Sequence, residues 1–462
     1  MDNRIAWVWL SLACGAGSRA PVNLLRVFSS AENILKADRK TLSEKLDKPD
    51  RGLLSALSNK DTSEAQMILQ RCDENNVLVL TPADPRYPRA LYQLRDAPCV
   101  LYAIGYLPDF EKNCCCAVVG TRKMSDYGKG MAYSIGRGLG AGGAVLVSGL
   151  ALGVDGMAMA GALSAGGTTV GVLGCGIDIV YPGEHKELFS RVIKTGAIIT
   201  EYPPGTPPSG RNFPIRNRII SGLSDAVVIV EGDLRSGALI TARHALYQGR
   251  ELYAVPGRIG DAGAAGTNLL IKTGAQAITD AVDVLKNYEF IYPHSVRVKA
   301  AETAMEGKAT PEDVTDVAVR MNVSTPDGPK YYGQGNYGGK KGTTVPRETP
   351  RRTAKPKKEK NLPSKKVLAR FDEHKAEAKR NMIPANPVAF DLLDDSAKNV
   401  YAAMTADVPC LADDIRVEGL SIPDILTALT LLELCGAVEC TAGNYYVKRS
   451  LTEISGADSE KE

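Results

Sequence analysis

Three arginines and an aromatic ring lie close together in the middle of the chain. Arg211, Phe213, Arg216 and Arg218 fall within eight residues, together with two asparagines. Pro214 suits the first turn of a helix, which predicts that Arg216 and Arg218 lie near a helix N-terminus. Free N–H groups and the helix dipole favour anions there, so cations fit best when a bound phosphate lies between them. The segment therefore predicts a phosphate-binding site, with a solvated basic turn as the alternative.

The elements that must position these side chains alternate along the chain. Apolar runs predict strands at 115–119, 144–148, 168–173, 197–200, 226–230 and 251–255, and helical patterns separate them at 126–139, 154–165, 184–195, 213–222 and 237–248. Continuously apolar strands are typical of a parallel sheet buried on both faces, and the alternation is typical of right-handed βαβ units. The expected fold is α/β, an extended Rossmann-like, doubly wound parallel sheet. Ligands of such sheets bind beyond the carboxyl ends of the strands.

Small, hydroxyl and basic residues follow several of these predicted strands. Backbone N–H groups in such turns can hold phosphates without obstruction by side chains, and Phe213 offers a face on which a base can stack. Because the turns share one edge of the sheet, we predict a polyanion-binding site there. Its expected residues are Gly120, Thr121, Arg122, Ser148, Gly149, Arg211, Phe213, Arg216, Asn217, Arg218, Ser236 and Gly237.

Motifs for ATP hydrolysis, dinucleotide binding and metal binding are weak or missing in the sequence. It has no GxxxxGK[ST] phosphate loop, and the glycines at 138–143 follow a helix, which favours a helix C-cap and turn over a dinucleotide loop. His185 and His244 lack the paired spacing of a metal site. We therefore expect no catalytic residue, metal or cofactor.

Two other functions remain open at this stage. Glu231 ends the fifth predicted strand, and with Ser236 and Gly237 it suits a Rossmann-like nucleotide (nucleoside monophosphate) hydrolase. Glu231, and Glu201 at the end of the fourth predicted strand, also suit a structural role, in which the carboxylate orients Arg216 or Arg218. A purely architectural adaptor, which binds no DNA at any salt concentration, is the third reading.

Composition limits the class of protein. The formal net charge is only +3, so a nucleic-acid surface must be local. Ten cysteines without a CxxC pair suggest free thiols in a reducing cytoplasm. No apolar run reaches the roughly 18 residues that a membrane span needs, so no membrane association is expected. The apolar start of the chain weakly resembles a secretory signal, but Asp2, Trp7 and Trp9 favour a first core helix.

Changes in composition divide the chain into five predicted segments. Residues 1–75 resemble a helical SAM or helix-hairpin-helix module, 76–290 form the Rossmann-like domain, 291–386 a flexible basic linker, 387–450 a winged-helix-like domain and 451–462 an acidic disordered tail. In the winged-helix-like part we expect helices at 396–404, 411–417 and 421–435, then a hairpin at 438–447. The helix from Pro423 to Leu434 has no Lys or Arg, which favours protein contact or packing over DNA reading.

Eight motifs follow one another along the predicted sheet domain. They are, in order, Val119-Gly120-Thr121-Arg122, Ser148-Gly149-Leu150-Ala151 with Gly153-Val154-Asp155, Gly174-Cys175-Gly176-Ile177-Asp178 with Tyr181-Pro182, Glu201-Tyr202-Pro203, Phe213-Pro214 with Arg216-Asn217-Arg218-Ile219-Ile220, Ser236-Gly237 with Leu239-Ile240-Thr241-Ala242, Val255-Pro256-Gly257 and Gly266-Thr267-Asn268. Residues 5–287, which contain these motifs, resemble the DNA-processing protein A (DprA/Smf) family.

The resemblance implies a homodimer that binds single-stranded DNA and hands it to the RecA recombinase during natural transformation. It implies no enzymatic activity. Two positions depart from the family pattern: Met159 stands where a histidine is usual, and Thr200 replaces the serine of Ser-Glu-Tyr-Pro.

Overall fold

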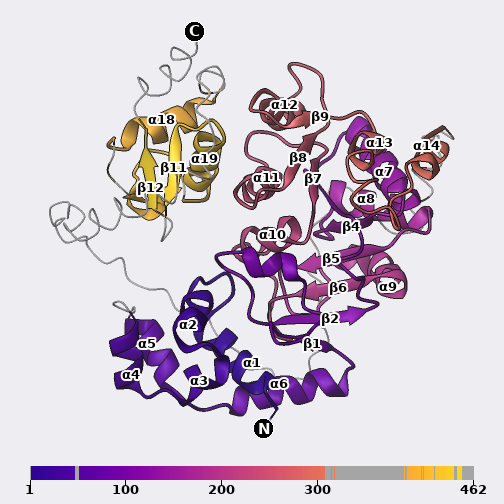
Figure 1. Ribbon diagram of the computed structural model, residues 1–462. Helices are drawn as coiled ribbons and strands as arrows, with labels where there is room; N and C mark the ends of the chain where they lie inside the picture. Colours follow the sequence, from indigo (N-terminus) through magenta and orange to yellow (C-terminus); the bar gives the residue numbers. More distant parts are fainter. Residues whose placement is uncertain are drawn as a thin grey trace, which may run out of the picture.

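A computed structural model shows a helical N-terminal segment, a central sheet covered by helices, and a small C-terminal module (Figure 1). It describes residues 2–46, 51–306, 314, 317, 390, 393–406, 408, 410–420, 422–441 and 445–449. The Gly-Tyr-rich and basic parts of the predicted linker, and the predicted acidic tail, lie outside these residues. In the described part, no helix is long and apolar enough to cross a membrane, and the cysteines form no disulfide.

The central sheet of the described chain has nine strands in the order β1-β2-β6-β5-β4-β3-β7-β8-β9. Their bounds are β1 (Leu78–Leu80), β2 (Leu101–Gly105), β3 (Cys115–Val119), β4 (Val145–Ser148), β5 (Thr169–Leu173), β6 (Ala197–Thr200), β7 (Ala226–Ile229), β8 (Glu251–Ala254) and β9 (Gln276–Ala277). Strands β3 to β9 pair in parallel, whereas β1 and β2 pair antiparallel at one edge. The predicted α/β class with a mostly parallel sheet is confirmed.

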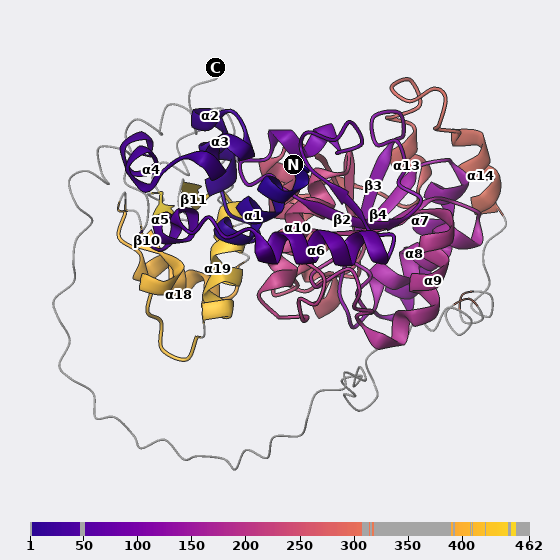
Figure 2. The same cartoon turned by 90° about the horizontal axis from the view of Figure 1, so that it is seen from below.

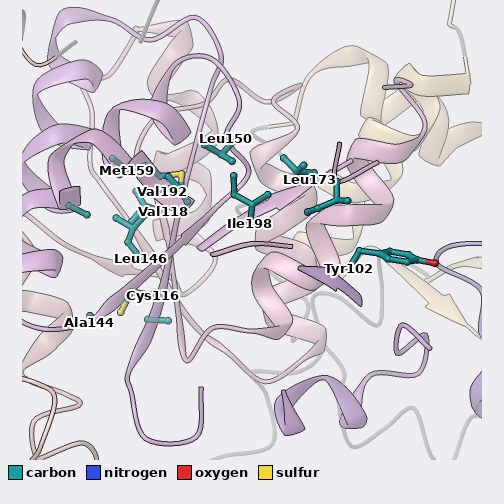
Figure 3. Packing of buried hydrophobic residues seen from close by; sticks show 14 of the residues in the cluster. Tyr102, Cys116, Val118, Ala144, Leu146, Leu150, Met159, Leu173, Val192 and Ile198 are labelled. Carbon is teal, nitrogen blue, oxygen red and sulfur yellow. The ribbon is translucent and has the colours of Figure 1, made fainter. Parts of the chain in front are cut away.

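Helices cover both faces of this sheet. One face packs against α7 (Asp126–Ala141), α8 (Val154–Ser164) and α9 (Lys186–Thr195), and the other against α10 (Asn212–Gly222), α11 (Ala238–Tyr247) and α12 (Ala265–Lys272). Alternate residues of β3 point to opposite faces: Cys116 and Val118 belong to the first core and Cys115 and Ala117 to the second. Figure 3 shows residues of the first core, among them Met159 of α8. Met159, the residue that departs from the family pattern, is fully buried.

In residues 2–46 and 51–75 the structure describes six helices: α1 (Arg4–Cys14), α2 (Ala20–Phe28), α3 (Ala31–Lys36), α4 (Arg39–Lys45), α5 (Arg51–Ser58) and α6 (Ser63–Glu74). Trp7 and Trp9 are buried, so α1 is a core helix as predicted. Ser30 and Asp38 cap α3 and α4 by accepting hydrogen bonds from backbone N–H groups. Figure 2 shows α6 running beside the sheet, and the Arg71 guanidinium lies 2.6 Å from the carboxylate of Asp178 in the sheet domain.

The chain remains ordered beyond residue 290, where the flexible linker was expected to begin. Helices α13 (Val282–Leu285) and α14 (Val298–Glu306) follow β9, and α14 packs against α7. Ala301 of α14 is buried, and the Arg137 side chain donates to the Ala304 carbonyl at 2.7 Å. Gly138, in the last turn of α7, gives room to the chain that follows β9, because a Cβ there would lie 2.6 Å from the Ala281 Cβ and 3.0 Å from the Met305 sulfur of α14. The linker prediction was wrong at this end because the alanine-rich face of α14 is apolar enough to pack.

The C-terminal module contains α18 (Asp395–Ala403), α19 (Ile422–Leu434) and a sheet in the order β10-β12-β11. Its strands are β10 (Cys410–Leu411), β11 (Val438–Thr441) and β12 (Tyr445–Lys448), and the last two form the predicted hairpin. The helix expected at 411–417 is only a short 3-10 turn, η5 (Ala412–Asp414). Its two acidic residues, Asp413 and Asp414, and the following Arg416 leave few apolar positions for a longer helix to bury.

Candidate nucleic-acid interface

A cleft of about 400 Å³ opens at the carboxyl ends of β3, β4 and β5. Its walls come from the turns after these three strands, from the loop that carries Tyr181 and Pro182, and from the first turns of α10. Ligands of parallel sheets bind at this edge. The cleft therefore lies where the sequence placed it, but only three of the six predicted strand ends line it.

Two aromatic rings and two guanidinium groups meet in this cleft. The rings of Tyr181 and Phe213 stack with their centroids 5.4 Å apart and an angle of 26° between their planes. The Arg122 guanidinium carbon lies 5.2 Å from the Phe213 centroid, and that of Arg216 lies 6.0 Å from it. Positive charge over an aromatic face is favourable because the ring face is electron-rich. The arrangement offers flat apolar surface and positive charge within one small site.

Arg216 forms the floor of the cleft and is fixed by backbone oxygens. Its side chain is only 4% exposed, and its Nη1 donates to the carbonyls of Gly149, at 2.9 Å, and of Val172. Burial lowers the pKa of Arg216 to about 10, although the negative charge of the nearby Asp155 carboxylate raises this pKa. Arg216 therefore stays protonated at neutral pH. Burial also raises the pKa of Asp155, whose Oδ2 accepts a hydrogen bond from the Gly149 N–H at 3.0 Å.

The turn after β4 is shaped so that this guanidinium fits. A Cβ at Gly149 would lie 2.6 Å from Arg216 Nη2 and equally close to Asp155 Oδ2, so a larger residue has no room. Leu150 has φ 54°, a left-handed conformation that is rare for a residue with a side chain. The fully buried His185 donates from Nδ1 to the Leu150 carbonyl at 3.0 Å. These contacts hold the Gly149 carbonyl under Arg216.

Arg218 does not reach the cleft, although it was expected to share the binding surface with Arg216. It is 2% exposed, and its Nη2 lies 2.8 Å from both carboxylate oxygens of Glu201. Asp96 contributes a second carboxylate at 3.4 Å. Residues two apart on a helix point in different directions, so Arg216 faces the cleft and Arg218 the interior. Arg218 is therefore a structural residue, and Glu201 orients it as the structural reading of that carboxylate suggested.

The remaining predicted residues surround the cleft at different depths. Arg122 is exposed on the turn after β3, and Arg211 is exposed just before α10. Ser148 is fully buried and its hydroxyl donates to the Val118 carbonyl at 2.6 Å, so it shapes the strand end and does not face solvent. The others, Gly120, Thr121, Asn217, Ser236 and Gly237, are exposed or partly exposed outside the cleft lining. Asn217 contacts the Gly237 carbonyl at 3.5 Å, which links α10 to the turn before α11.

Glu231, the candidate acid of the hydrolase alternative, has a structural role in this fold. Its carboxylate accepts hydrogen bonds from the Ser125 N–H and hydroxyl, with the closest contacts at 3.0 Å. Ser125 in turn caps α7 by accepting from the Gly128 N–H. A Cβ at Gly128 would lie only 1.6 Å from the carboxylate. Glu231 therefore anchors the start of α7 and lies outside the cleft lining.

Tyr181, Pro182 and Cys175 line the cleft but were not among the predicted site residues. Cys175 follows β5 between two glycines, and Tyr181 and Pro182 are six and seven residues further along the same loop. Burial raises the pKa of Cys175 to about 11, so it stays a thiol at neutral pH. Their position in the sequence could have predicted this, because the loop after a parallel strand lies at the same edge of the sheet as the other strand ends.

The fold and cleft together define an α/β protein with a cationic, aromatic ligand site at the carboxyl edge of a mostly parallel sheet. Residues 78–289 match the family described as DNA recombination-mediator protein A. The chain is 40% identical over 219 residues to DNA processing protein DprA of Bacillus subtilis, which is 47% of this chain and 74% of that protein. The chain belongs to the DNA-processing protein A (DprA/Smf) family.

Two further relatives agree with this assignment. Protein Smf of Escherichia coli is 43% identical over 213 residues, covering 46% of this chain and 57% of the relative. The X-ray structure of DNA processing protein A from Streptococcus pneumoniae is 31% identical, with a TM-score of 0.54 over 62% of this chain and 98% of that chain. The similarity thus includes the sheet domain, while the described C-terminal module lies outside the family match.

Proposed function

We propose that this protein binds single-stranded DNA, with one unpaired base entering the cleft between Arg122, Tyr181 and Phe213. The observation that carries the proposal is the placement of the Arg122 guanidinium over the Phe213 ring, which itself stacks on Tyr181. Every base has a π-face, so stacking on such a platform tolerates any sequence and contributes about 1–3 kcal/mol per base. Family membership supports the same function, because the family is described as a recombination mediator.

The DNA backbone is proposed to follow the rim of the cleft. Arg122 and Arg211 are exposed there and neutralise phosphates, while Gly120, Thr121, Asn217, Ser236 and Gly237 offer small side chains and backbone groups along the same edge. Arg216 supplies fixed positive charge from beneath. Ser148, Gly149 and Arg218 support this surface from the interior and are not proposed as contacts. No catalytic residue is part of the proposal.

The direct test compares single-stranded with duplex DNA of equal length. The proposed contact with Phe213 needs an unstacked base, whereas paired bases remain stacked inside a duplex. Fluorescence anisotropy with a labelled oligothymidylate and a labelled duplex, repeated over a salt series, should show tighter binding of the single strand at every salt concentration. Equal or tighter binding of the duplex, or no binding of either DNA at low salt, would refute the proposal.

Loading of RecA onto the bound strand is proposed as the role in natural transformation. The support is the family description as a recombination mediator together with the DNA-processing relatives. In a strand-exchange assay on DNA coated with single-strand-binding protein, the wild-type protein should shorten the lag before RecA filaments form. The Arg122→Ala variant should not. An unchanged lag with the wild-type protein would contradict this role.

A homodimer and a winged-helix identity for the C-terminal module complete the proposed architecture. Large apolar side chains that a second copy can cover are exposed on loops of the sheet domain, including Ile259 at 95% and Phe290 at 92%. The succession of α18, a short 3-10 turn, α19 and a hairpin supports the winged-helix proposal. Analytical ultracentrifugation should give twice the chain mass for the wild-type protein and a monomer for an Ile259→Asp, Phe290→Asp variant. A monomeric wild-type protein at micromolar concentration would exclude the dimer.

A further inference from the structure

The C-terminal module packs against α11 of the sheet domain through α19. The buried apolar residues of this side of the sheet form one cluster that includes residues of both parts, such as Leu239 and Ala242 of α11 and Leu432 of α19. The start of α18 also approaches the turn before α11, where the Arg235 guanidinium lies 3.3 Å from the Ser396 hydroxyl and 3.7 Å from the Asp394 carboxylate. The module therefore covers α11 from its beginning to its last turn.

A buried carboxylate marks this contact as specific. Glu433 of α19 is 1% exposed, its Oε2 lies 2.9 Å from Arg243 Nη1, and its Oε1 accepts a hydrogen bond from the Tyr247 hydroxyl. Both partners belong to α11. A carboxylate is costly to bury without such partners, so α19 carries a charge whose burial is compensated by the sheet domain. This also explains why α19 lacks basic residues: its face is complementary to a basic and phenolic surface of the same chain.

The contact has a solvent-open edge, where a shallow hollow lies between Arg235, Asp394 and the α19 residues Thr427, Ala428 and Leu431. Within one chain, interfaces between domains resemble transient interfaces between proteins, so relative movement is expected unless the interface is large and apolar. Residues 307–394 connect α14 to α18, so the module stays tethered when it leaves. Because the module is tethered, its local concentration at α11 stays high. The module therefore competes with ligands from solution for the α11 surface.

We propose that the C-terminal module is a reversible cap on α11. In the closed arrangement Glu433 occupies a docking surface made by Arg243 and Tyr247. In the open arrangement the same surface accepts a helix of another protein that carries a carboxylate on an apolar face. The cap thus controls access of a protein partner to the sheet domain. This inference rests on the contact between α11 and α19 and does not depend on DNA binding.

The test uses the full chain and two ways of opening the cap. Glu433→Gln removes the charge from the module, and Arg243→Ala with Tyr247→Phe removes its partners from α11. Hydrogen exchange should become faster in both α11 and α19 in either variant, while β3 and β7 keep their protection. Arg449→Ala is the matched control, because Arg449 pairs with Glu439 inside the module, at 3.6 Å. Unchanged exchange of α11 and α19 in both opening variants would overturn the proposal.

A labelled peptide of residues 422–436 with a short polar tail then tests whether the exposed surface binds an acidic helix. It should bind the Glu433→Gln protein about tenfold or more tightly than the wild-type protein, because the tethered module no longer competes. Adding Arg243→Ala to Glu433→Gln should abolish this binding. Equal binding to wild-type and Glu433→Gln proteins would show that the module is not a cap. No binding to Glu433→Gln would show that α11 is not a docking surface for such a helix.

Discussion

The guanidinium of Arg122 lies over the ring of Phe213, 5.2 Å from its centroid, although ninety-one positions separate them in the sequence. The turn after β3 supplies the arginine, and the first turn of α10 supplies the ring. Folding thus combines a charged group that suits phosphate with a flat surface that suits a base. Phe213 also packs closely against Gly174, where a Cβ would lie 2.8 Å from the ring. The ring is therefore held in place before any ligand arrives.

Replacing Phe213 by Ala should weaken binding of single-stranded DNA by about 1–3 kcal/mol, the usual contribution of one stacked base. The salt dependence of binding should not change, because no charge is lost. Anisotropy titrations with an oligothymidylate measure both quantities. Tyr106→Ala is the control, since Tyr106 is 69% exposed and outside the cleft. A Phe213→Ala protein that binds as tightly as the wild type would exclude stacking on this ring.

Gly149→Ala should destabilise the protein by about 1–3 kcal/mol, the usual cost of an extra methyl group in a filled site. The new Cβ would press on Arg216 and Asp155, so DNA affinity should fall as well. Gly130→Ala is the matched control, because Gly130 lies within α7 and a Cβ there meets nothing within 4 Å. That change should stabilise the helix by up to about 1 kcal/mol. Urea unfolding gives both values, and equal effects of the two substitutions would contradict the geometry.

Arg218→Met should lower the free energy of unfolding by about 3–5 kcal/mol, because it leaves the buried Glu201 carboxylate without its main partner. Adding Glu201→Gln should recover part of the loss by removing the unpaired charge. The DNA affinity of the folded double variant, and its salt dependence, should match the wild type. A reduced salt dependence would instead place Arg218 on the DNA-binding surface.

Stability should fall in acid because of His185. Burial lowers the pKa of this histidine in the folded protein, whereas the unfolded chain keeps the ordinary value near 6.5. Below that pH the unfolded state binds more protons, so stability drops by up to about 1.4 kcal/mol per pH unit until the lower folded pKa is reached. His185→Asn keeps a donor for Leu150 without a titrating group. Urea unfolding from pH 7.5 to 5 should therefore be less pH-dependent in the variant. Identical pH profiles would show that His185 is not buried as a neutral ring.

The sheet was predictable from sequence to within one residue at each of its six predicted strands, because a strand buried on both faces is continuously apolar. The same pattern predicted the sheet edge at which the cleft lies, and binding of a ligand there stays a prediction. Sequence did not show that Arg216 lines the cleft whereas Arg218 lies in the interior. Helical spacing shows that the two do not share a face, but Glu201 and Asp96, which draw Arg218 inward, come from distant segments.

Other features depended on contacts that no local pattern contains. Tyr181 reaches the cleft only because the loop after β5 returns over the sheet edge to meet Phe213. The packing of α14 on α7 relies on missing side chains at glycines such as Gly138. The contact of α19 with α11 joins residues 190 positions apart, as in the pair of Arg243 with Glu433. Sequence suggested a protein contact for α19, and only the structure showed that this chain supplies the partner.

The most direct test of the central claim is the salt dependence of oligothymidylate binding by Arg122→Ala. If Arg122 neutralises a phosphate beside the base in the cleft, the slope of log K against log salt should become shallower by about 0.7, the value for one contact on a single strand. Affinity at low salt should fall as well. Arg191→Ala removes an equal charge from α9, where Arg191 pairs with Glu187, and should leave the slope unchanged. An Arg122→Ala protein with the wild-type slope and affinity would contradict the account.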